Sequence, residues 1–228
     1  MSIMGSPNGW LDLLESQLPD LLELVVDTWK DIPNLTSDLE DKITATFCRE
    51  LRKSRKARNL MFMVDPQSVE LNPAQGQSEG RLDIIFRPTG LKISPDEEIY
   101  FCLECKRLNF LSSQERKTGA PEYVKDGMIR FINGQYAKSV KHGAMLGYVL
   151  DGKIDKAMMN VTKHVQKHSA KLCMKPPVIL HPSSILTDLE NARESFHLRQ
   201  GETNLFTIHH IFVNADKLVT TVEDGKTN

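Results

Sequence analysis

The sequence predicts an α/β fold in which a central mixed β-sheet is flanked by helices. In the second half of the chain, short apolar segments alternate with segments of helical periodicity, as in α/β proteins. Between two strand-like segments, 81–87 and 98–106, lies the turn sequence Pro88-Thr89-Gly90, which favours an antiparallel hairpin. The 228 residues, 40% of them apolar, suffice for one domain with a sizeable core.

The first part of the chain is predicted to form two helices. Over 9–30, apolar residues recur at steps of three and four, namely Trp10, Leu13, Leu14, Leu18, Leu21, Leu22, Val25, Val26 and Trp29. Pro33 and Asn34 end this helix. A second helix, 38–57, opens with the sequence Ser37-Asp38-Leu39-Glu40, which fits a capping box, and its core side is formed by Ile43, Phe47 and Leu51.

Apolar runs and turn sequences predict the other elements. Strands are expected at 60–64, 81–87, 98–106, 144–150, 177–180 and 206–213. Helices are expected at 121–141, where Pro121 suits the first turn, and at 153–171. Polar residues with Pro and Gly predict a mobile loop at 65–79, and a second loop is expected at 107–120.

The charges are unevenly distributed along a chain whose net charge is only −1. Residues 1–46 carry nine acidic and two basic side chains, whereas 49–58 carry six basic and one acidic. Such a basic run is typical of a solvated helix face, and alternatively it contacts phosphates. We predict an acidic helical extension over 1–34, followed by a single domain over 35–228.

The composition also bears on the compartment. No apolar run approaches the roughly 18–20 residues that a membrane span needs. Residues 1–10 lack the pattern of a signal peptide. The four cysteines show no spacing of a disulfide framework. We therefore expect a cytoplasmic protein without a membrane partner.

Three charged residues in predicted strands are the candidate catalytic residues. Glu104 and Lys106 are two residues apart in one strand, so their side chains point to the same face. Asp83 lies in the preceding strand, which a hairpin would place beside them. A carboxylate in an apolar strand is costly without a partner, and a metal ion offsets that cost.

The chemistry of phosphodiester hydrolysis explains why these residue types would be combined. Two carboxylates can hold Mg²⁺, with Mn²⁺ as an alternative, and the metal polarises the phosphate and activates a water molecule. The backbone carbonyl of Cys105 lies between the two side chains and is a further candidate ligand. The ammonium group of Lys106 can position the water or stabilise developing charge.

An aspartate on one strand followed about twenty residues later by Glu-X-Lys on the next resembles the PD-(D/E)XK nuclease superfamily. The motif reads Leu82-Asp83 and Glu104-Cys105-Lys106, with leucine where the family name has proline. The resemblance covers about 37–150 and implies a restriction-endonuclease-like core and metal-dependent cleavage of DNA. The alternative is that Glu104 and Lys106 form an ion pair on an edge strand.

Further residues are candidates for supporting roles. The resemblance suggests a glutamate on the first core helix as an additional metal ligand, which is Glu40, although Glu40 also fits the capping box and Asp41 competes for the role. Gly127 and Gly134 are seven apart and would share a helix face, which indicates close approach of the sheet or of a nucleic acid. Candidate DNA contacts are Arg52, Lys53, Arg55, Lys125, Arg130 and Gln135.

Together these features predict a DNA nuclease that acts in host defence against phage or other foreign DNA. Repair or recombination is the alternative among enzymes. A catalytically silent scaffold or nucleic-acid-binding subunit is the alternative outside them. The N-terminal helix is expected to cap the core or to dock a partner or a second copy of the chain.

Overall fold

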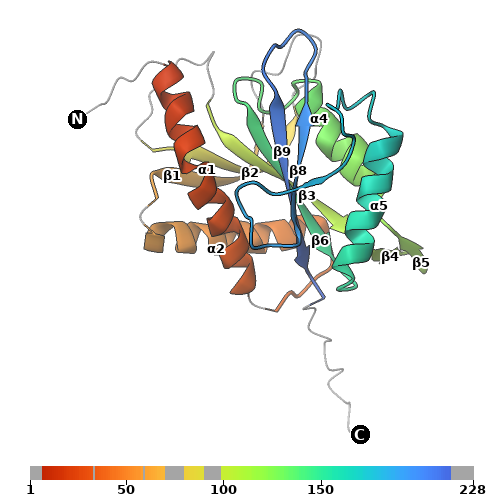
Figure 1. Cartoon of the computed structure of the whole chain (residues 1–228). Helices are drawn as coiled ribbons and strands as arrows, with labels where there is room; N and C mark the ends of the chain where they lie inside the picture. The colour runs from red at the N-terminus through yellow and green to blue at the C-terminus, as the bar shows by residue number, and fades with distance from the viewer. Residues whose placement is uncertain (1–6, 33, 59, 70–79, 90–98, 217–228) are drawn as a thin grey trace, which may run out of the picture.

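The computed structural model of the chain describes residues 7–32, 34–58, 60–69, 80–89 and 99–216. Within these residues, a seven-stranded mixed sheet has the order β1-β2-β3-β6-β9-β8-β7 (Figure 1). The neighbours β3–β6 and β6–β9 are parallel and the other pairs antiparallel. The strands are β1 (Phe62–Val69), β2 (Arg81–Pro88), β3 (Phe101–Leu108), β6 (His142–Val149), β7 (His181–Pro182), β8 (Ala192–His197) and β9 (Phe206–Asn214).

Helices cover both faces of this sheet. On one face lie α1 (Pro7–Lys30) and α2 (Glu40–Arg58), where Trp29 stacks on Tyr148 of β6 with 5.2 Å between ring centroids. On the other face lie α3 (Ala120–Glu122), the π-helix η1 (Tyr123–Met128), α4 (Ile129–Ile132) and α5 (Ile154–Lys167). Tyr123 of η1 stacks there on Phe212 of β9, with 5.8 Å between centroids.

Burial on two faces explains the composition of the central strands. In β3 and β6 nearly every residue is buried, which is expected when helices cover both sides of a strand. Glu104 is therefore a charged residue inside a strand that otherwise reads as core. None of the helices in the described part of the chain combines the length and apolarity that a membrane span requires.

The predicted fold class is confirmed, and so are the hairpin of β2 and β3, the two N-terminal helices and the strand at 144–150. The helix predicted at 153–171 is α5, which ends at Lys167. The N-terminal helix shares one hydrophobic core with the rest of the chain. Its apolar face packs there, and the indole N–H of Trp29 donates to the carbonyl of Asn214 at 3.0 Å.

Four predictions of secondary structure are wrong. Residues 177–180 form no strand, and the strands in this region are β7 and β8, whose polar residues give little strand signal. The segment 107–120 contains a hairpin of β4 (Phe110–Ser112) and β5 (Glu115–Lys117) rather than only a loop. Residues 65–69 continue β1, while the rest of the predicted loop, 70–79, lies outside the described residues.

The fourth wrong prediction is the long helix at 121–141, since the helical segment ends at Ile132. Gly134 has a φ of 72°, the left-handed conformation that commonly follows a helix and that glycine adopts without strain. Gly127 and Gly134 therefore do not share a helix face. The strand predicted at 98–106 is β3, which begins at Phe101, and residue 98 lies outside the described residues.

Candidate active site

The two strands that carry the acidic residues separate at the candidate site. The ladder between β2 and β3 pairs Phe86 with Phe101 and ends at the pair of Ile84 and Leu103. One residue further, the carboxylate of Asp83 accepts a hydrogen bond from the backbone N–H of Cys105 at 2.8 Å. The N–H of Cys105 thus bonds the side chain of Asp83 instead of a backbone carbonyl of β2. The two strands therefore separate at Asp83 and Cys105.

This opening also directs the backbone of Cys105 toward the site. The N–H and C=O of one residue in an extended strand point to the same edge, so the carbonyl of Cys105 faces the gap next to β2. The ammonium of Lys106 donates to this oxygen at 2.9 Å. The Cys105 carbonyl therefore lies among the charged groups, as it must if it is to be the predicted metal ligand.

Lys106 lies at the centre of the cluster. Its ammonium donates to a carboxylate oxygen of Glu104 at 2.8 Å and to one of Glu40 at 3.2 Å. Burial alone would lower the pKa of Lys106, but the neighbouring Glu104, Asp83 and Glu40 outweigh it and raise this pKa above its ordinary value. Lys106 is thus a permanent cation and hydrogen-bond donor.

Glu104 has one satisfied and one unsatisfied carboxylate oxygen. Its side chain is only 2% exposed, and Oε1 accepts from both Lys106 and Arg130. Oε2 is buried and has no hydrogen-bond partner. Burial and the charge of Asp83 raise the pKa of Glu104 to about 8. Burial also raises the pKa of Asp83, although Lys106 acts in the opposite direction. Burial is the largest cause of both shifts.

Arg130 and Tyr136 complete the cluster from the other face of the sheet. The guanidinium of Arg130 donates to Glu104 at 3.1 Å and to the hydroxyl of Tyr136 at 2.8 Å. That hydroxyl donates its own proton to the carbonyl of Arg81, at the start of β2, at 2.6 Å. Of the candidate DNA contacts, Arg130 is the one that the structure places against a catalytic candidate.

Glu40 reaches the site instead of closing a capping box. Its carboxylate accepts from the ammonium of Lys106 at 3.2 Å and from the backbone N–H of Arg107 at 2.8 Å. The hydroxyl of Ser37 accepts from Leu39 rather than from residue 40, so the predicted capping box is wrong. Asp41 is exposed. Glu40 is therefore the acid of this helix that joins the cluster, while its metal-binding role stays a prediction.

The residues present fit a small divalent cation in part. Hard cations take oxygen ligands, and the cluster offers the carboxylates of Asp83 and Glu104 together with the Cys105 carbonyl. The partnerless Oε2 of Glu104 is the atom that a cation would satisfy. Within the described residues, however, no three His, Cys, Asp or Glu side chains are grouped to hold a metal ion. A cation here would take its other ligands from the backbone and from water.

Two basic residues of α2 donate hydrogen bonds to backbone carbonyls at the edge of the sheet. Arg52 donates to the carbonyl of Val64 at 2.7 Å, and Arg55 donates to the carbonyls of Leu60 and Phe62 at 3.1 and 2.6 Å. Lys53 is exposed and pairs with Glu50 on the same helix. Two of the three predicted DNA contacts on this helix thus already bind the backbone of β1 and of the segment just before it.

The other predicted contacts lie on or after the helical segment. Lys125 is exposed on η1. Gln135 is half-buried and lies next to Gly80 at the start of β2. A Cβ on Gly127 would press on the side chain of Met145 and lie 3.7 Å from Cγ of Glu104. Gly127 therefore allows close packing of η1 against the sheet, one of the two alternatives predicted for it.

Sequence reasoning missed two features of the site. One is Tyr136, whose hydroxyl joins Arg130 to β2. In the structure its ring lies against Gly80, where a Cβ would collide with it, but nothing in the sequence links these two residues. The other is the π-helical turn η1, a distortion often found at functional sites. Both depend on contacts between distant segments.

Comparison of the chain with protein-family models, with curated proteins and with solved structures returns no match. The residues of the cluster and the motif that they form are therefore the basis for a functional assignment.

Proposed function

We propose that the cluster of Asp83, Glu104 and Lys106 is the active site of a metal-dependent nuclease of the PD-(D/E)XK type. The observation that carries the proposal is the buried Oε2 of Glu104, which has no partner although Lys106 and Arg130 both bind Oε1. Buried polar atoms in folded proteins are nearly always hydrogen-bonded. A cation bound between the carboxylates of Glu104 and Asp83 would give this oxygen its partner.

Each residue of the cluster has a role in this proposal. Asp83, Glu104 and the Cys105 carbonyl hold Mg²⁺ or Mn²⁺, and Glu40 is a candidate for a further contact. The bound ion supplies charge neutralisation at the phosphate and a water molecule of lowered pKa. Lys106 remains a cation and donates to the attacking water or to a phosphate oxygen. Arg130 holds Oε1 of Glu104 and leaves Oε2 available to a cation.

Different observations support a restriction-endonuclease-like core and DNA as the substrate. The core assignment is supported by the order of elements: helix, strand, strand with Asp83, strand with Glu104 and Lys106, helix, parallel strand. DNA is supported by the motif resemblance, and by exposed Lys53 and Lys125. We propose host defence as the setting, a role that the motif resemblance allows.

The test is cleavage of supercoiled plasmid with Mg²⁺ or Mn²⁺. Asp83→Ala and Lys106→Ala are each expected to lower the rate about 100-fold or more, the loss typical of removing one charged group from a transition state. Asp155→Ala and Lys156→Ala remove the same charges from exposed positions of α5 and are expected to cut like the wild type.

Two results would count against the proposal. Cleavage that neither Asp83→Ala nor Lys106→Ala reduces would place the chemistry elsewhere. Failure of the wild type to cut single- or double-stranded DNA or RNA, together with no calorimetric signal for Mn²⁺, would favour a catalytically silent scaffold.

A further inference from the structure

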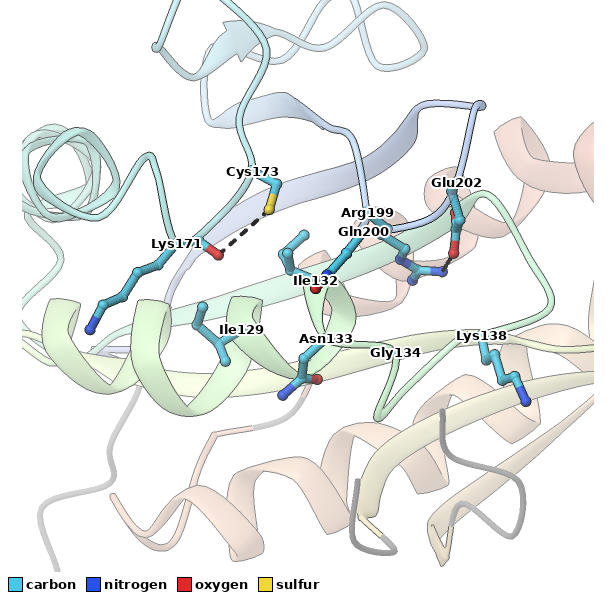
Figure 2. A pocket seen from close by; sticks show the side chains of 10 residues that line it. All are labelled: Ile129, Ile132, Asn133, Gly134, Lys138, Lys171, Cys173, Arg199, Gln200 and Glu202. Carbon is cyan, nitrogen blue, oxygen red and sulfur yellow. Dashed lines mark hydrogen bonds and ion pairs between the residues drawn. The ribbon is translucent and has the colours of Figure 1, made fainter. Parts of the chain in front are cut away.

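A cavity lined by both polar and apolar residues lies beside α4. Its volume is about 480 Å³, within the range of small-molecule sites. Ile129 and Ile132 of α4 line it together with Arg199 and Glu202 (Figure 2). Arg130, between the two isoleucines in sequence, points instead to Glu104.

Arg199 is the unusual residue of this cavity because it is a buried cation, with only 3% of the residue exposed. Its guanidinium lies 3.5 Å from the centroid of the Phe206 ring. It donates to the backbone carbonyl of Ala137 at 2.9 Å, with longer contacts to the carbonyls of Val140 and Tyr136 at 3.5 and 3.4 Å. These neutral partners fix the position of the guanidinium without neutralising it.

The charge of Arg199 is incompletely balanced. Its ion-pair partner among the described residues is Glu202, at 3.6 Å, and the Glu202 side chain is 41% exposed. The Nε of Arg199 is buried and has no hydrogen-bond partner. Burial lowers the pKa of Arg199 to about 10, and Glu202 restores only part of it. A buried cation normally has a close and well-bonded anion.

We infer that this cavity binds a phosphate monoester of about nucleotide size, whose phosphate displaces the Glu202 carboxylate and bonds Arg199. The Glu202 carboxylate is placed to be displaced, because its side chain is 41% exposed and its contact to Arg199 is long, at 3.6 Å. The N–H at Nε of Arg199 has no partner, and a phosphate oxygen is a strong acceptor for a charge-assisted hydrogen bond from arginine.

The other lining residues favour a phosphorylated organic molecule over a bare ion. Lys138 and Lys171 lie at the two ends of the cavity, with side chains directed outward as Figure 2 shows. Both are exposed and can turn toward a ligand. Counting these two lysines with Arg199 gives three positive charges against the one negative charge of Glu202. The apolar wall of Ile129 and Ile132 suits a base or another flat apolar group.

The experiment measures binding of adenosine 5′-monophosphate to the full chain by calorimetry, without divalent metal. Glu202→Gln removes the competing carboxylate and is expected to tighten binding. Lys138→Gln and Lys171→Gln are each expected to weaken it by up to about fivefold, as for a partly screened charge contact. Lys156→Gln, the same change at an exposed position of α5 outside the cavity, is expected to bind like the wild type.

Two more probes identify the source of the phosphate. Adenosine is expected not to bind, and inorganic phosphate to bind more weakly than the nucleotide. A 5′-phosphorylated oligonucleotide that competes with the nucleotide would assign the cavity to a strand end, and one that does not compete would assign it to a free nucleotide.

The inference does not depend on the proposed nuclease function, since Asp83→Ala is expected to keep the binding. It is overturned if neither the wild type nor Glu202→Gln binds the nucleotide, or if Lys156→Gln weakens binding as much as the two cavity lysines. Arg199→Lys is expected to lose nucleotide binding while it keeps the unfolding transition of the wild type.

Discussion

At the scale of single residues, Tyr136 connects the two strands of the proposed site. Its hydroxyl carries one proton, and because the carbonyl of Arg81 can only accept, that proton is donated to Arg81. The hydroxyl must therefore accept from Arg130, which in turn holds Glu104. Tyr136 is thus a positioning residue that acts through Arg130.

Tyr136→Phe tests this chain of contacts. Loss of the hydroxyl frees Arg130, and Mn²⁺ affinity is expected to fall about tenfold, as for other groups that orient metal ligands. Unfolding free energy should fall by about 1–2 kcal/mol, because the carbonyl of Arg81 loses its donor. Calorimetric Mn²⁺ titration and denaturant unfolding measure the two effects.

The matched control is Tyr100→Phe, which removes the buried hydroxyl that accepts from the N–H of Ala137 at 2.9 Å. It is expected to lower stability by a similar amount and to leave Mn²⁺ affinity unchanged. Equal losses of Mn²⁺ affinity in both variants would show that the effect of Tyr136 is one of general stability.

Some residues of the candidate site could be identified from the sequence and others could not. Asp83, Glu104 and Lys106 were identifiable because a charged residue inside an apolar strand is conspicuous and because strand alternation sets its direction. Tyr136 was not, since a tyrosine after a helix is ordinary in sequence. Its role depends on Arg81 and Arg130, which only the folded chain brings together.

At the scale of elements, α2 protects one edge of the sheet. β1 is the terminal strand on its side, and exposed edge strands invite pairing with other chains. Arg55 binds the carbonyls of Leu60 and Phe62, and Arg52 binds that of Val64. These contacts occupy backbone groups at the edge of the sheet.

Arg55→Ala should expose this edge. Unfolding free energy is expected to fall by about 1.5–3 kcal/mol, the range for hydrogen bonds to a charged group, and self-association should increase. Denaturant unfolding and sedimentation velocity measure the two effects. Lys56→Ala, an exposed neighbour on the same helix, is the control and should change neither.

DNA binding by the same variants separates the two interpretations of the basic segment. If Arg55 serves only the edge, Lys53→Ala and Lys56→Ala should lower DNA affinity at least as much as Arg55→Ala. A DNA-binding loss confined to Arg55→Ala, in protein that remains monomeric, would contradict the edge-protecting role.

A buried chain of hydrogen bonds joins η1, β9 and β8. The carbonyl of Leu172 can only accept, so His197 donates to it from Nδ1 at 2.7 Å. His197 Nε2 then accepts from Ser195 at 2.7 Å, and Ser195 accepts from Nε2 of His210 at 2.8 Å. His210 Nδ1 accepts from Tyr123 at 3.0 Å. Each donor has one acceptor only when both imidazoles are neutral.

This chain predicts a contribution to stability that acid removes. Burial lowers the pKa of His197 to about 4 from an ordinary 6.5. A lowered pKa means that the unfolded chain takes up a proton first, so the contribution of His197 is complete above pH 6.5 and is lost as pH falls toward about 4. The raised pKa of Glu104 acts with the opposite sign.

The variant His197→Gln isolates the histidine from Glu104. The difference in unfolding free energy between wild type and variant should be largest above about pH 6.5 and should shrink below it, by up to about 1.4 kcal/mol per pH unit. Denaturant unfolding at about pH 7.5, 6 and 5 measures it. A difference that does not vary with pH would mean that His197 does not titrate in this way.

Element boundaries show where local sequence fails. The residues that predicted a helix over 121–141 do not reveal that the chain turns at Gly134. The strands β7 and β8 were not predicted because their residues, such as His181 and Glu194, are polar. Their pairing with each other and with β9 is a tertiary effect that overrides weak local preference.

At the scale of the whole molecule, the arrangement of the sheet accounts for the site. The antiparallel hairpin of β2 and β3 opens at Asp83, while the parallel partner β6 remains paired along β3 from Leu103 to Leu108. One edge of β3 is therefore fixed and the other is free for side chains and backbone oxygens. Helices on both faces then supply Glu40 from one side and Arg130 from the other.

The alternation of elements was sufficient to predict this α/β sheet from sequence. The antiparallel pairing of β2 and β3 was predicted correctly, but Pro88 of the expected turn belongs to β2, and residue 90 lies outside the described residues. The sequence could not show that the acidic N-terminal helix completes the same core. Its apolar face packs through Trp29 against Phe47 and Tyr148, and this packing depends on how α1 and α2 cross the sheet. Docking of a partner on the remaining face of α1 stays a prediction.

If Asp83 and Glu104 share a divalent cation, anomalous scattering from a crystal soaked in Mn²⁺ will locate it. We expect one anomalous peak within coordination distance of the Asp83 carboxylate and of Oε2 of Glu104, and we expect Glu104→Gln to lose it. No peak at saturating Mn²⁺, or a peak that contacts neither carboxylate, would show that the two residues do not share a cation.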